Sequence, residues 1–587
     1  MVKNHYYQDN EDIKLYMKYI FDKETIIKEY EGDWDDSKVY KETNDDRFSY
    51  APDSLESASD NYEMILDAFG DLSGNYLSQV AKTMDEQGVK FNAGKVEFPP
   101  ELEEMWEKFQ EAGLLPYSLR RENQGLGIPI IIQSLCSEMS GRADHAFSMA
   151  MGLASLSETI ERYGTREQIE KFIPKMAAGD YGGAMALSEP NYGSDLPNVK
   201  TKAVKQEDGT YLITGTKVWI TNGCGVTKDR PAVILTLART GEPDSGARGL
   251  SFFIVDGKDV EIVGIEHKMG IRSSPTCTVA YENAPATIIG EEGFGLIRYA
   301  MGMMNVARIG VATVGVSLSV AAFEEAKKYA GEREQFGKVI KDIPAVKKIL
   351  ERMEREVYAM RALNLETART IDMYKWREAR LLKEGKSERE VRKDEQVKFW
   401  DKIAVLFTPL SKFYTTEKAN QLTYDSIQIH AGVGFTEEFD VAKLYRDARI
   451  LSIYEGTTQL QVVAAIGGIV SGLTDKGILR YYLDEMMGKY TPSNNTKLIR
   501  EKIEALVEEY KNIEKAEDRD YVAFEVVDST SRFIAGMIFE FNTNILNDKG
   551  EKEIAAKRFS MVEQYNIDTL ATIESSFVKL RSSRAIS

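Results

Sequence analysis

The sequence predicts an α+β protein in which a compact β region lies between two helical regions. Residues 1–180 place apolar side chains at the three-to-four spacing of helices, and helical patterns return after residue 290. Between them, β-branched and apolar residues alternate or form short runs bounded by turn residues. At 587 residues the chain has room for about four domains. We therefore expect an N-terminal extension (1–60), a helical domain (61–180), a β domain (181–290), a helical bundle (291–470) and an additional C-terminal helical domain (471–587).

Local patterns support the first helical region and the β region. Residues 67–88, DAFGDLSGNYLSQVAKTMDEQG, have helical spacing, and residues 99–115 open with two prolines, which favour a helix start. In the β region, YLITGTKVWITN (211–222) and AVILTLA (232–238) are typical of strands. The alternation of these patterns predicts a β domain with helical neighbours.

Two stretches of the second helical region stand out. Residues 354–396 are strongly charged, and we expect a helical hairpin with a solvated face. Val306–Phe323 is the most apolar stretch, but it carries Arg308 and only fifteen mostly small residues follow that arginine up to Phe323. We interpret it as a helix of a soluble protein and expect no membrane span.

Composition excludes several classes of function. The chain has 93 acidic and 75 basic residues and a formal charge of −18, which argues against binding to nucleic acid or anionic membranes. Its three cysteines show no disulfide framework and its N-terminus lacks the features of a signal peptide, so we expect a cytoplasmic protein. None of the four histidines stands at metal-ligand spacing, so we expect no metal site.

Two glycine-containing segments superficially match nucleotide-binding motifs. In GEREQFGKV (331–339), five residues rather than four separate the two glycines, and a valine follows the lysine where Ser or Thr is required. Gly432-Val433-Gly434 lacks the third glycine of a dinucleotide fingerprint and follows no clear strand. Neither segment predicts a nucleotide site of these kinds.

Four separated motifs are more specific. They are AMALSEPNYGSDLPNVKTKA (184–203), KVWITNG (217–223), GEREQFGK (331–338) with QIHAGVGF (428–435), and RDARILSIYEGTTQLQ (446–461). In order and spacing they resemble the acyl-CoA dehydrogenase family over about residues 60–470. The resemblance implies an acyl-CoA dehydrogenase-like fold: an N-terminal helical domain, a middle β domain and a C-terminal four-helix bundle. The last block of the chain would be an extra helical domain.

The loop LSEPNYGSD (187–195) combines hydroxyls with a proline and a glycine, and such loops present backbone N–H groups to anions or polar ring edges. A plain turn at a strand end is the alternative. The resemblance implies that Leu187 and Ser188 contact the isoalloxazine edge of FAD. It also implies that Ser194 reaches the FAD phosphate or the pantetheine arm of the substrate.

The triplet Trp219-Ile220-Thr221 ends a predicted strand and belongs to the implied cofactor site. A tryptophan in this position is more often a core residue. In the family, the tryptophan packs on the flavin face away from the substrate and the threonine hydroxyl bonds flavin N5. The protein then orients and tunes the flavin, which performs the redox chemistry.

The resemblance assigns Arg333 and Gln335, together with Gln428 and Gly432, to the FAD adenine and pyrophosphate of the neighbouring subunit. A guanidinium suits a pyrophosphate because its planar fork binds two oxygens. For Arg333 alone, a surface ion pair is the alternative interpretation.

Thr457 and Gln459 match further FAD contacts of the family. Pro344 is a departure, because the common pattern has a glutamine there that also touches the nucleotide. In this feature the chain resembles a large subgroup with an extended C-terminus, which includes the 3-methylmercaptopropionyl-CoA dehydrogenases. The contact of that glutamine must be missing or made by another residue.

Glu455 is the predicted catalytic base, because the resemblance places the base at this position. Most glutamates are solvated surface charges, but apolar residues precede this one and Gly456 follows it. A carboxylate in a dry site has a raised pKa and is a stronger base. Some family members carry the base on a helix instead, at the position of Ala307. Substrate contacts are implied for Ser194, Asn305, Arg308, Tyr454 and Gly456.

The resemblance implies FAD-dependent α,β-dehydrogenation of a saturated acyl-CoA to the trans-2-enoyl-CoA, as in the β-oxidation of fatty acids. Electrons would pass to an electron-transfer flavoprotein. A homodimer is favoured over a tetramer, because the extra domain usually covers the tetramer surface. Two alternatives stay open: an acyl-CoA oxidase that uses oxygen, and a non-catalytic flavoprotein that binds a partner through its C-terminal domain.

Overall fold

The N-terminal extension is a set of short helices that packs on the rest of the protein. The computed structural model describes residues 1–152 and 156–586. The side chains of Asn10 and Asp22 cap the first two of these helices, whereas the third begins after Trp34 without a side-chain cap. These helices are α1 (Glu11–Leu15), α2 (Lys23–Glu31) and α3 (Asp35–Thr43).

The N-terminal helical domain begins at Ser54, which forms a capping box with Ser57. The helix Pro100–Glu111 of this domain begins with a proline in its first turn, as the sequence predicts. The elements of this domain are α4 (Leu55–Asp71), α5 (Ser78–Gln87), β1 (Lys90–Asn92), β2 (Lys95–Glu97), α6 (Pro100–Glu111), α7 (Ile130–Ala143), α8 (His145–Gly152), α9 (Ser157–Tyr163) and α10 (Arg166–Ala177).

The β domain is a strongly curved sheet. Antiparallel pairing runs β5–β9–β7–β6, and the short β4 pairs with β5 and, through a single register pair, with β6, so these strands close on themselves. Their inward side chains form a separate hydrophobic cluster. The strands are β3 (Gly182–Ala186), β4 (Lys202–Lys205), β5 (Tyr211–Thr221), β6 (Ala232–Arg239), β7 (Leu250–Asp256), β8 (Glu261–Ile265) and β9 (Thr276–Ile289).

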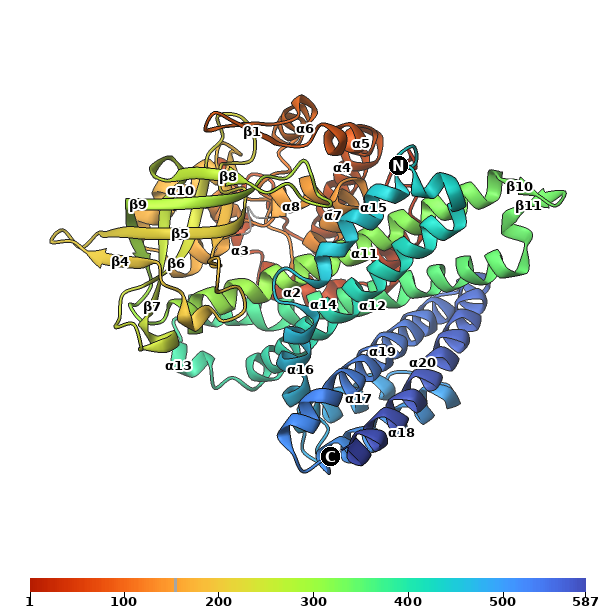
Figure 1. Ribbon diagram of the computed structural model, residues 1–587. Helices are drawn as coiled ribbons and strands as arrows, with labels where there is room; N and C mark the ends of the chain where they lie inside the picture. The colour runs from red at the N-terminus through yellow and green to blue at the C-terminus, as the bar shows by residue number, and fades with distance from the viewer. Residues whose placement is uncertain (153–155, 587) are drawn as a thin grey trace.

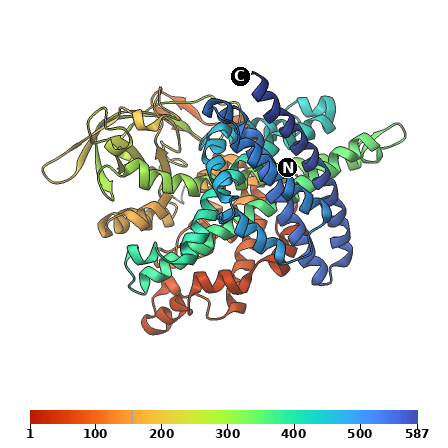
Figure 2. The same cartoon turned by 90° about the horizontal axis from the view of Figure 1, so that it is seen from below.

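The helical bundle lies beside the β domain, and its longest helices run along one another (Figures 1 and 2). A short hairpin, β10 (Glu334–Gln335) with β11 (Lys338–Val339), projects from the end of the bundle that is remote from the β domain. The helices are α11 (Met301–Glu332), α12 (Pro344–Lys383), α13 (Glu388–Val391), α14 (Glu395–His430), α15 (Val441–Ala448) and α16 (Thr458–Gly472).

The apolar stretch is longer than the sequence indicated. The helical segment Gly295–Glu332 has 38 residues and, alone among the described helices, is long and apolar enough to cross a membrane. In its most apolar window, however, 83% of the residues are buried inside the protein. Its composition is therefore accounted for by its place in the core of the bundle.

The prediction of a solvated hairpin for residues 354–396 is right only for residues 382–396, which are mostly exposed; residues 354–381 are buried or partly buried. Most of that stretch belongs to α12, whose middle is buried, and its charges are paired across the helix interfaces. The guanidinium of Arg361 lies 2.5 Å from the Glu138 carboxylate. Asp372 accepts hydrogen bonds from the first two backbone N–H groups of α7 at 2.8 and 3.0 Å. High charge here marks a buried ionic network, which sequence patterning does not distinguish from a solvated face.

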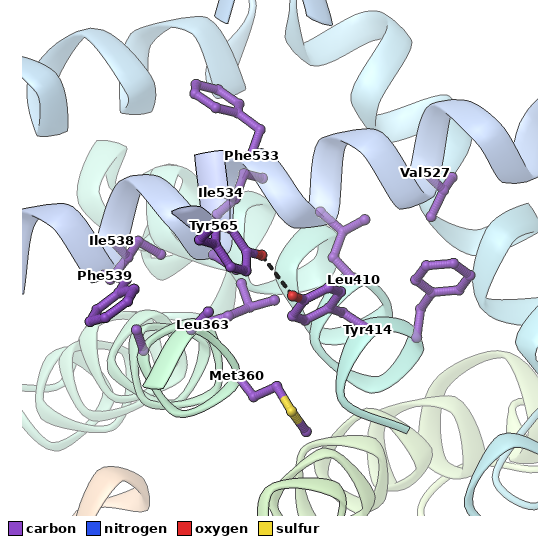
Figure 3. Packing of buried hydrophobic residues seen from close by; sticks show 14 of the residues in the cluster. Met360, Leu363, Leu410, Tyr414, Val527, Phe533, Ile534, Ile538, Phe539 and Tyr565 are labelled. Carbon is purple, nitrogen blue, oxygen red and sulfur yellow. Dashed lines mark hydrogen bonds between the residues drawn. The ribbon is translucent and has the colours of Figure 1, made fainter. Parts of the chain in front are cut away.

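The C-terminal helices pack against the bundle and share one hydrophobic core with it. Figure 3 shows Leu363 of α12 close to Ile534 of α19 and Tyr565 of α20, whereas Met360 of α12 points away from them. At the same interface, the hydroxyls of Tyr414 and Tyr565 lie 2.6 Å apart. The helices are α17 (Ile478–Gly488), α18 (Asn494–Lys511), α19 (Ala516–Asp548) and α20 (Lys552–Ile586).

Because Ile534 is fully buried at this interface, its truncation to alanine should leave a cavity and cost about 2–5 kcal/mol. Val578 is 67% exposed, so Val578→Ala should change stability by less than about 0.5 kcal/mol. Thermal unfolding of both variants checks this prediction. Equal melting temperatures would show that the C-terminal helices do not contribute to the common core.

Candidate active site

A cavity of 1120 Å³ lies where the β domain, the α8–α9 region, α11 and the segment before α16 meet. Most residues that the sequence predicts for the site line it. They are Leu187, Ser188, Ser194, Trp219, Ile220, Thr221, Asn305, Arg308, Tyr454, Glu455, Gly456 and Thr457.

The remaining predicted residues do not line this cavity. Arg333 and Gln335 lie on the projecting hairpin with its 91% exposed Phe336, and Gln428, Gly432 and Gln459 are also exposed. Pro344, where the family has a glutamine, is the first residue of α12. The chain therefore does not bring its hairpin residues to its own cavity.

The loop that follows β3 is held in shape by a buried carboxylate. Glu189 accepts hydrogen bonds from the backbone N–H groups of Lys200 and Thr201 at 2.7 and 2.8 Å. Lys217 Nζ lies 3.0 Å from the same carboxylate and donates to the Leu187 carbonyl at 2.9 Å. Although burial acts to raise the pKa of Glu189, Lys217 and these N–H groups hold it below the ordinary value. Buried hydrogen bonds and an ion pair thus fix the conformation of this loop, which a plain turn at a strand end would not require.

Trp219 is not a core residue. The pairing of β5 with β9 is irregular between Lys217 and Ile220, and Trp219 has a left-handed backbone with φ 64°. Trp219 is 61% exposed and lines the cavity, whereas Ile220, which also borders the cavity, is buried in the β domain core. Because the hydroxyl-bearing residues Ser188 and Thr221 line the same wall, these residues fit a planar aromatic ring with a polar edge, such as a flavin.

Glu455 lies in a strained turn just before α16. Glu455 has φ 54° and Gly456 has φ 89°, both in the left-handed region that non-glycine residues rarely adopt. The Gln461 side-chain amide donates to the carbonyls of both residues, at 3.2 and 2.9 Å. Lys412 Nζ donates to the Gly456 carbonyl at 2.8 Å. The strain is therefore held in place by side chains from α14 and α16.

The electrostatics suit a proton acceptor. Burial raises the pKa of Glu455 to about 7, against the opposing influence of Arg308 and Lys412. Its Oε2 has no hydrogen-bond partner among the residues that the structure describes. Within the same residues its backbone N–H has no acceptor either. A base that titrates near neutrality and keeps free polar atoms can take a proton from a ligand.

Arg308 and Ala307 complete this part of the cavity. Arg308 is mostly buried and donates to the Asn305 side-chain carbonyl oxygen at 3.1 Å. Ala307 lines the cavity without offering a carboxylate. Of the two positions at which the sequence analysis considers a base, only that of Glu455 carries a carboxylate.

Two residues near the base were missed by the sequence analysis. Lys412 is buried, and its only signal is that it is the single charged residue between Lys402 and Glu417. His145 is also buried, with Nε2 3.1 Å from the Tyr454 hydroxyl, and burial lowers its pKa to about 4. The imidazole is therefore neutral at pH 7, and no local pattern connects it with a tyrosine so distant in sequence.

Fold and cavity together define an oxidoreductase in which a base and a flavin-fitting wall face the same space. Family profiles agree. Residues 59–180 match the N-terminal domain of acyl-CoA dehydrogenases, residues 184–284 the middle domain, and residues 295–385 and 395–466 the C-terminal domain. The chain belongs to the acyl-CoA dehydrogenase family, whose members are FAD-dependent oxidoreductases.

Individual relatives are similar over most of this region. The 3-methylmercaptopropionyl-CoA dehydrogenase of Ruegeria pomeroyi is 33% identical over 430 residues, which cover 70% of each chain. The caffeyl-CoA reductase-Etf complex subunit CarC of Acetobacterium woodii is 32% identical over 63% of this chain and 90% of its own. An acyl-CoA dehydrogenase of Bacillus anthracis, solved with FAD, shares the fold with a TM-score of 0.71 at 22% identity over 90% of both chains. The shared fold thus reaches beyond the three family domains.

The raised pKa of Glu455 predicts a pH-dependent effect on stability. Below about pH 4.5 the carboxyl is protonated in both the folded and the unfolded chain. As the pH rises toward 7, it ionises only in the unfolded chain, so the free energy of unfolding decreases. Glu455→Gln removes this loss and should stabilise the protein by up to about 3 kcal/mol at pH 8, with little effect at pH 4. Melting temperatures at both pH values test it, with exposed Glu207→Gln as the control. An equal effect of Glu455→Gln at both pH values would contradict a raised pKa.

Proposed function

We propose that this chain binds FAD and removes one α and one β hydrogen from a saturated acyl-CoA, giving the trans-2-enoyl-CoA. The observation that carries the proposal is the unpaired, partly buried carboxylate of Glu455 in the same cavity as the exposed indole of Trp219. Bound FAD supplies the acceptor for the β hydrogen and its electron pair.

The chain itself supplies the proton chemistry. Glu455 takes the α-proton of the thioester, and the electron pair of that C–H bond becomes part of the new double bond as the β hydrogen leaves with its pair. The free backbone N–H of Glu455 is available to the thioester oxygen, where negative charge develops. Arg308 favours the ionised form of Glu455 before the transfer.

We further propose that electrons leave through an electron-transfer flavoprotein. The name of the Acetobacterium woodii relative places that subunit in an Etf complex. Acryloyl-CoA reductase of Anaerotignum propionicum, which is 30% identical over 66% of this chain, is named for the opposite direction. We favour the oxidative direction because the relative from Ruegeria pomeroyi is named a dehydrogenase. Rapid peroxide formation without an added acceptor would instead identify an oxidase.

We also propose a homodimer in the cytoplasm. Exposed Arg333, Gln335, Gln428 and Gly432 lie outside their own cavity, which supports a cofactor site completed by a second copy. The described cysteines are all free thiols, which suits a reducing compartment.

Glu455→Gln keeps the size of the side chain but cannot accept a proton, so the rate of flavin reduction should fall at least about 10²-fold. Acyl-CoA affinity should change little, because the backbone N–H is retained, and stopped-flow reduction with separate binding measurements checks both expectations. If the Ala307 position faces the same α-carbon, Glu455→Gln with Ala307→Glu should regain part of the rate. Reduction of Glu455→Gln at the wild-type rate would place the base elsewhere.

Arg333→Ala should weaken FAD retention without unfolding the chain, because Arg333 is exposed in the monomer. Lys338→Ala, on the same hairpin, is the matched control for a general loss of positive charge. Gel filtration with flavin absorbance gives bound FAD per chain and the oligomeric state. A stable monomer that keeps FAD, in wild type or in Arg333→Ala, would contradict the shared site.

A further inference from the structure

We propose that Lys412 is a positioning residue for the catalytic base: its ammonium favours the ionised form of Glu455 and its hydrogen bond holds the turn that presents it. The inference rests on the proposed function only in naming Glu455 as the base. Lys412 does not line the cavity, so it acts on the reaction through Glu455 rather than through a ligand.

Lys412 differs in its surroundings from the other buried lysines. The structure describes four buried lysines, and three of them lie within 3.0 Å of a carboxylate: Lys217, Lys418 and Lys443. Lys412 is completely buried, yet no carboxylate among the described residues lies within salt-bridge distance. Burying an ammonium without an ion pair is costly, so a structural role alone gives no reason for a charge here.

The charge of Lys412 lies beside the turn that carries Glu455. Lys412 is in the middle of α14, and its Nζ is 2.8 Å from the carbonyl of Gly456, the residue that follows the base. Glu455 from the turn, Glu417 from α14 and Arg308 from α11 are the charged groups that act on it. Burial lowers the pKa of Lys412 to about 8, and Glu455 and Glu417 oppose that decrease, so the ammonium keeps its proton near neutral pH.

The consequence for Glu455 follows from the sign of these charges. Two cations, Arg308 and Lys412, oppose the effect of burial on its pKa. Without Lys412 only Arg308 remains, and the carboxyl must ionise at higher pH. The base would then be protonated over a larger part of the neutral range than in the wild type.

The hydrogen bond supplies the second part of the role. Glu455 and Gly456 both have left-handed φ, and the Gly456 carbonyl accepts from Lys412 as well as from Gln461. Lys412 thus ties the strained turn to α14, whereas Gln461 ties it to α16. An uncharged side chain that donates a hydrogen bond can replace this contact with the Gly456 carbonyl. It cannot replace the effect of the ammonium on the pKa of Glu455.

Three substitutions separate the two contributions. Lys412→Met has similar length but neither charge nor donor, Lys412→Gln keeps a donor, and Lys412→Arg keeps both. Melting temperature and FAD content identify any variant that fails to fold. If Lys412→Met fails to fold, Lys412→Gln and Lys412→Arg still form a matched pair. The first readout is the titration of the Glu455 carboxyl by infrared difference spectroscopy, assigned by its loss in Glu455→Gln.

We expect the Glu455 titration to move to higher pH in Lys412→Met and Lys412→Gln, by about one unit, and to stay near the wild-type value in Lys412→Arg. Flavin reduction should then be about tenfold slower at pH values below the titration, because each unit lowers the ionised fraction tenfold. At high pH, where Glu455 is ionised in every variant, Lys412→Gln should be faster than Lys412→Met.

A Glu455 carboxyl that titrates at the wild-type pH in both uncharged variants would overturn the inference. The infrared readout needs no substrate, so this failure is distinct from that of the proposed function. If no acyl-CoA reduces the wild-type flavin, the function fails, while the titration still decides the role of Lys412.

Discussion

Glu455 depends on a balance between burial, which disfavours its charge, and two nearby cations, which favour it. With burial alone the carboxyl would stay protonated, and in an open, solvated site it would be a weak base with an ordinary pKa. The observed turn places Glu455 in the cavity wall, where both Arg308 and the buried Lys412 act on its carboxyl. The left-handed backbone of residues 455 and 456 is the conformational cost of that placement.

The domain arrangement serves this site by bringing distant segments to one cavity. The β domain contributes the wall with Trp219, the bundle contributes Glu455, the proposed base, and residues of α8 and α9 also line the cavity. Among the described residues, none beyond Leu460 lines the cavity, so the C-terminal helices lie outside it. They instead extend the hydrophobic core of the bundle on the other side of α12 and α14 (Figure 3).

The sequence predicted the order of helical and β regions because periodicity is a local property, and its motifs predicted twelve of the residues that line the cavity. It could not predict features that arise from packing. The charges of α12 pair with partners far away in the chain, such as Arg361 with Glu138, and so they read as a solvated face. The motif assigned Trp219 to the cofactor site, but the irregular pairing of β5 with β9 beside it could not be predicted. Lys412 lies in an apolar run that gives no sign of Gly456 as its partner.

Anaerobic titration of the purified, FAD-loaded protein with a panel of acyl-CoA thioesters tests the central claim most directly. The panel should vary chain length and branching and include aryl and sulfur-containing acyl groups, because the sequence does not identify the acyl group. We expect at least one thioester to bleach the flavin absorbance and to yield the corresponding trans-2-enoyl-CoA. A protein that binds FAD and acyl-CoA but is bleached by none of them would contradict the assignment of a dehydrogenase site.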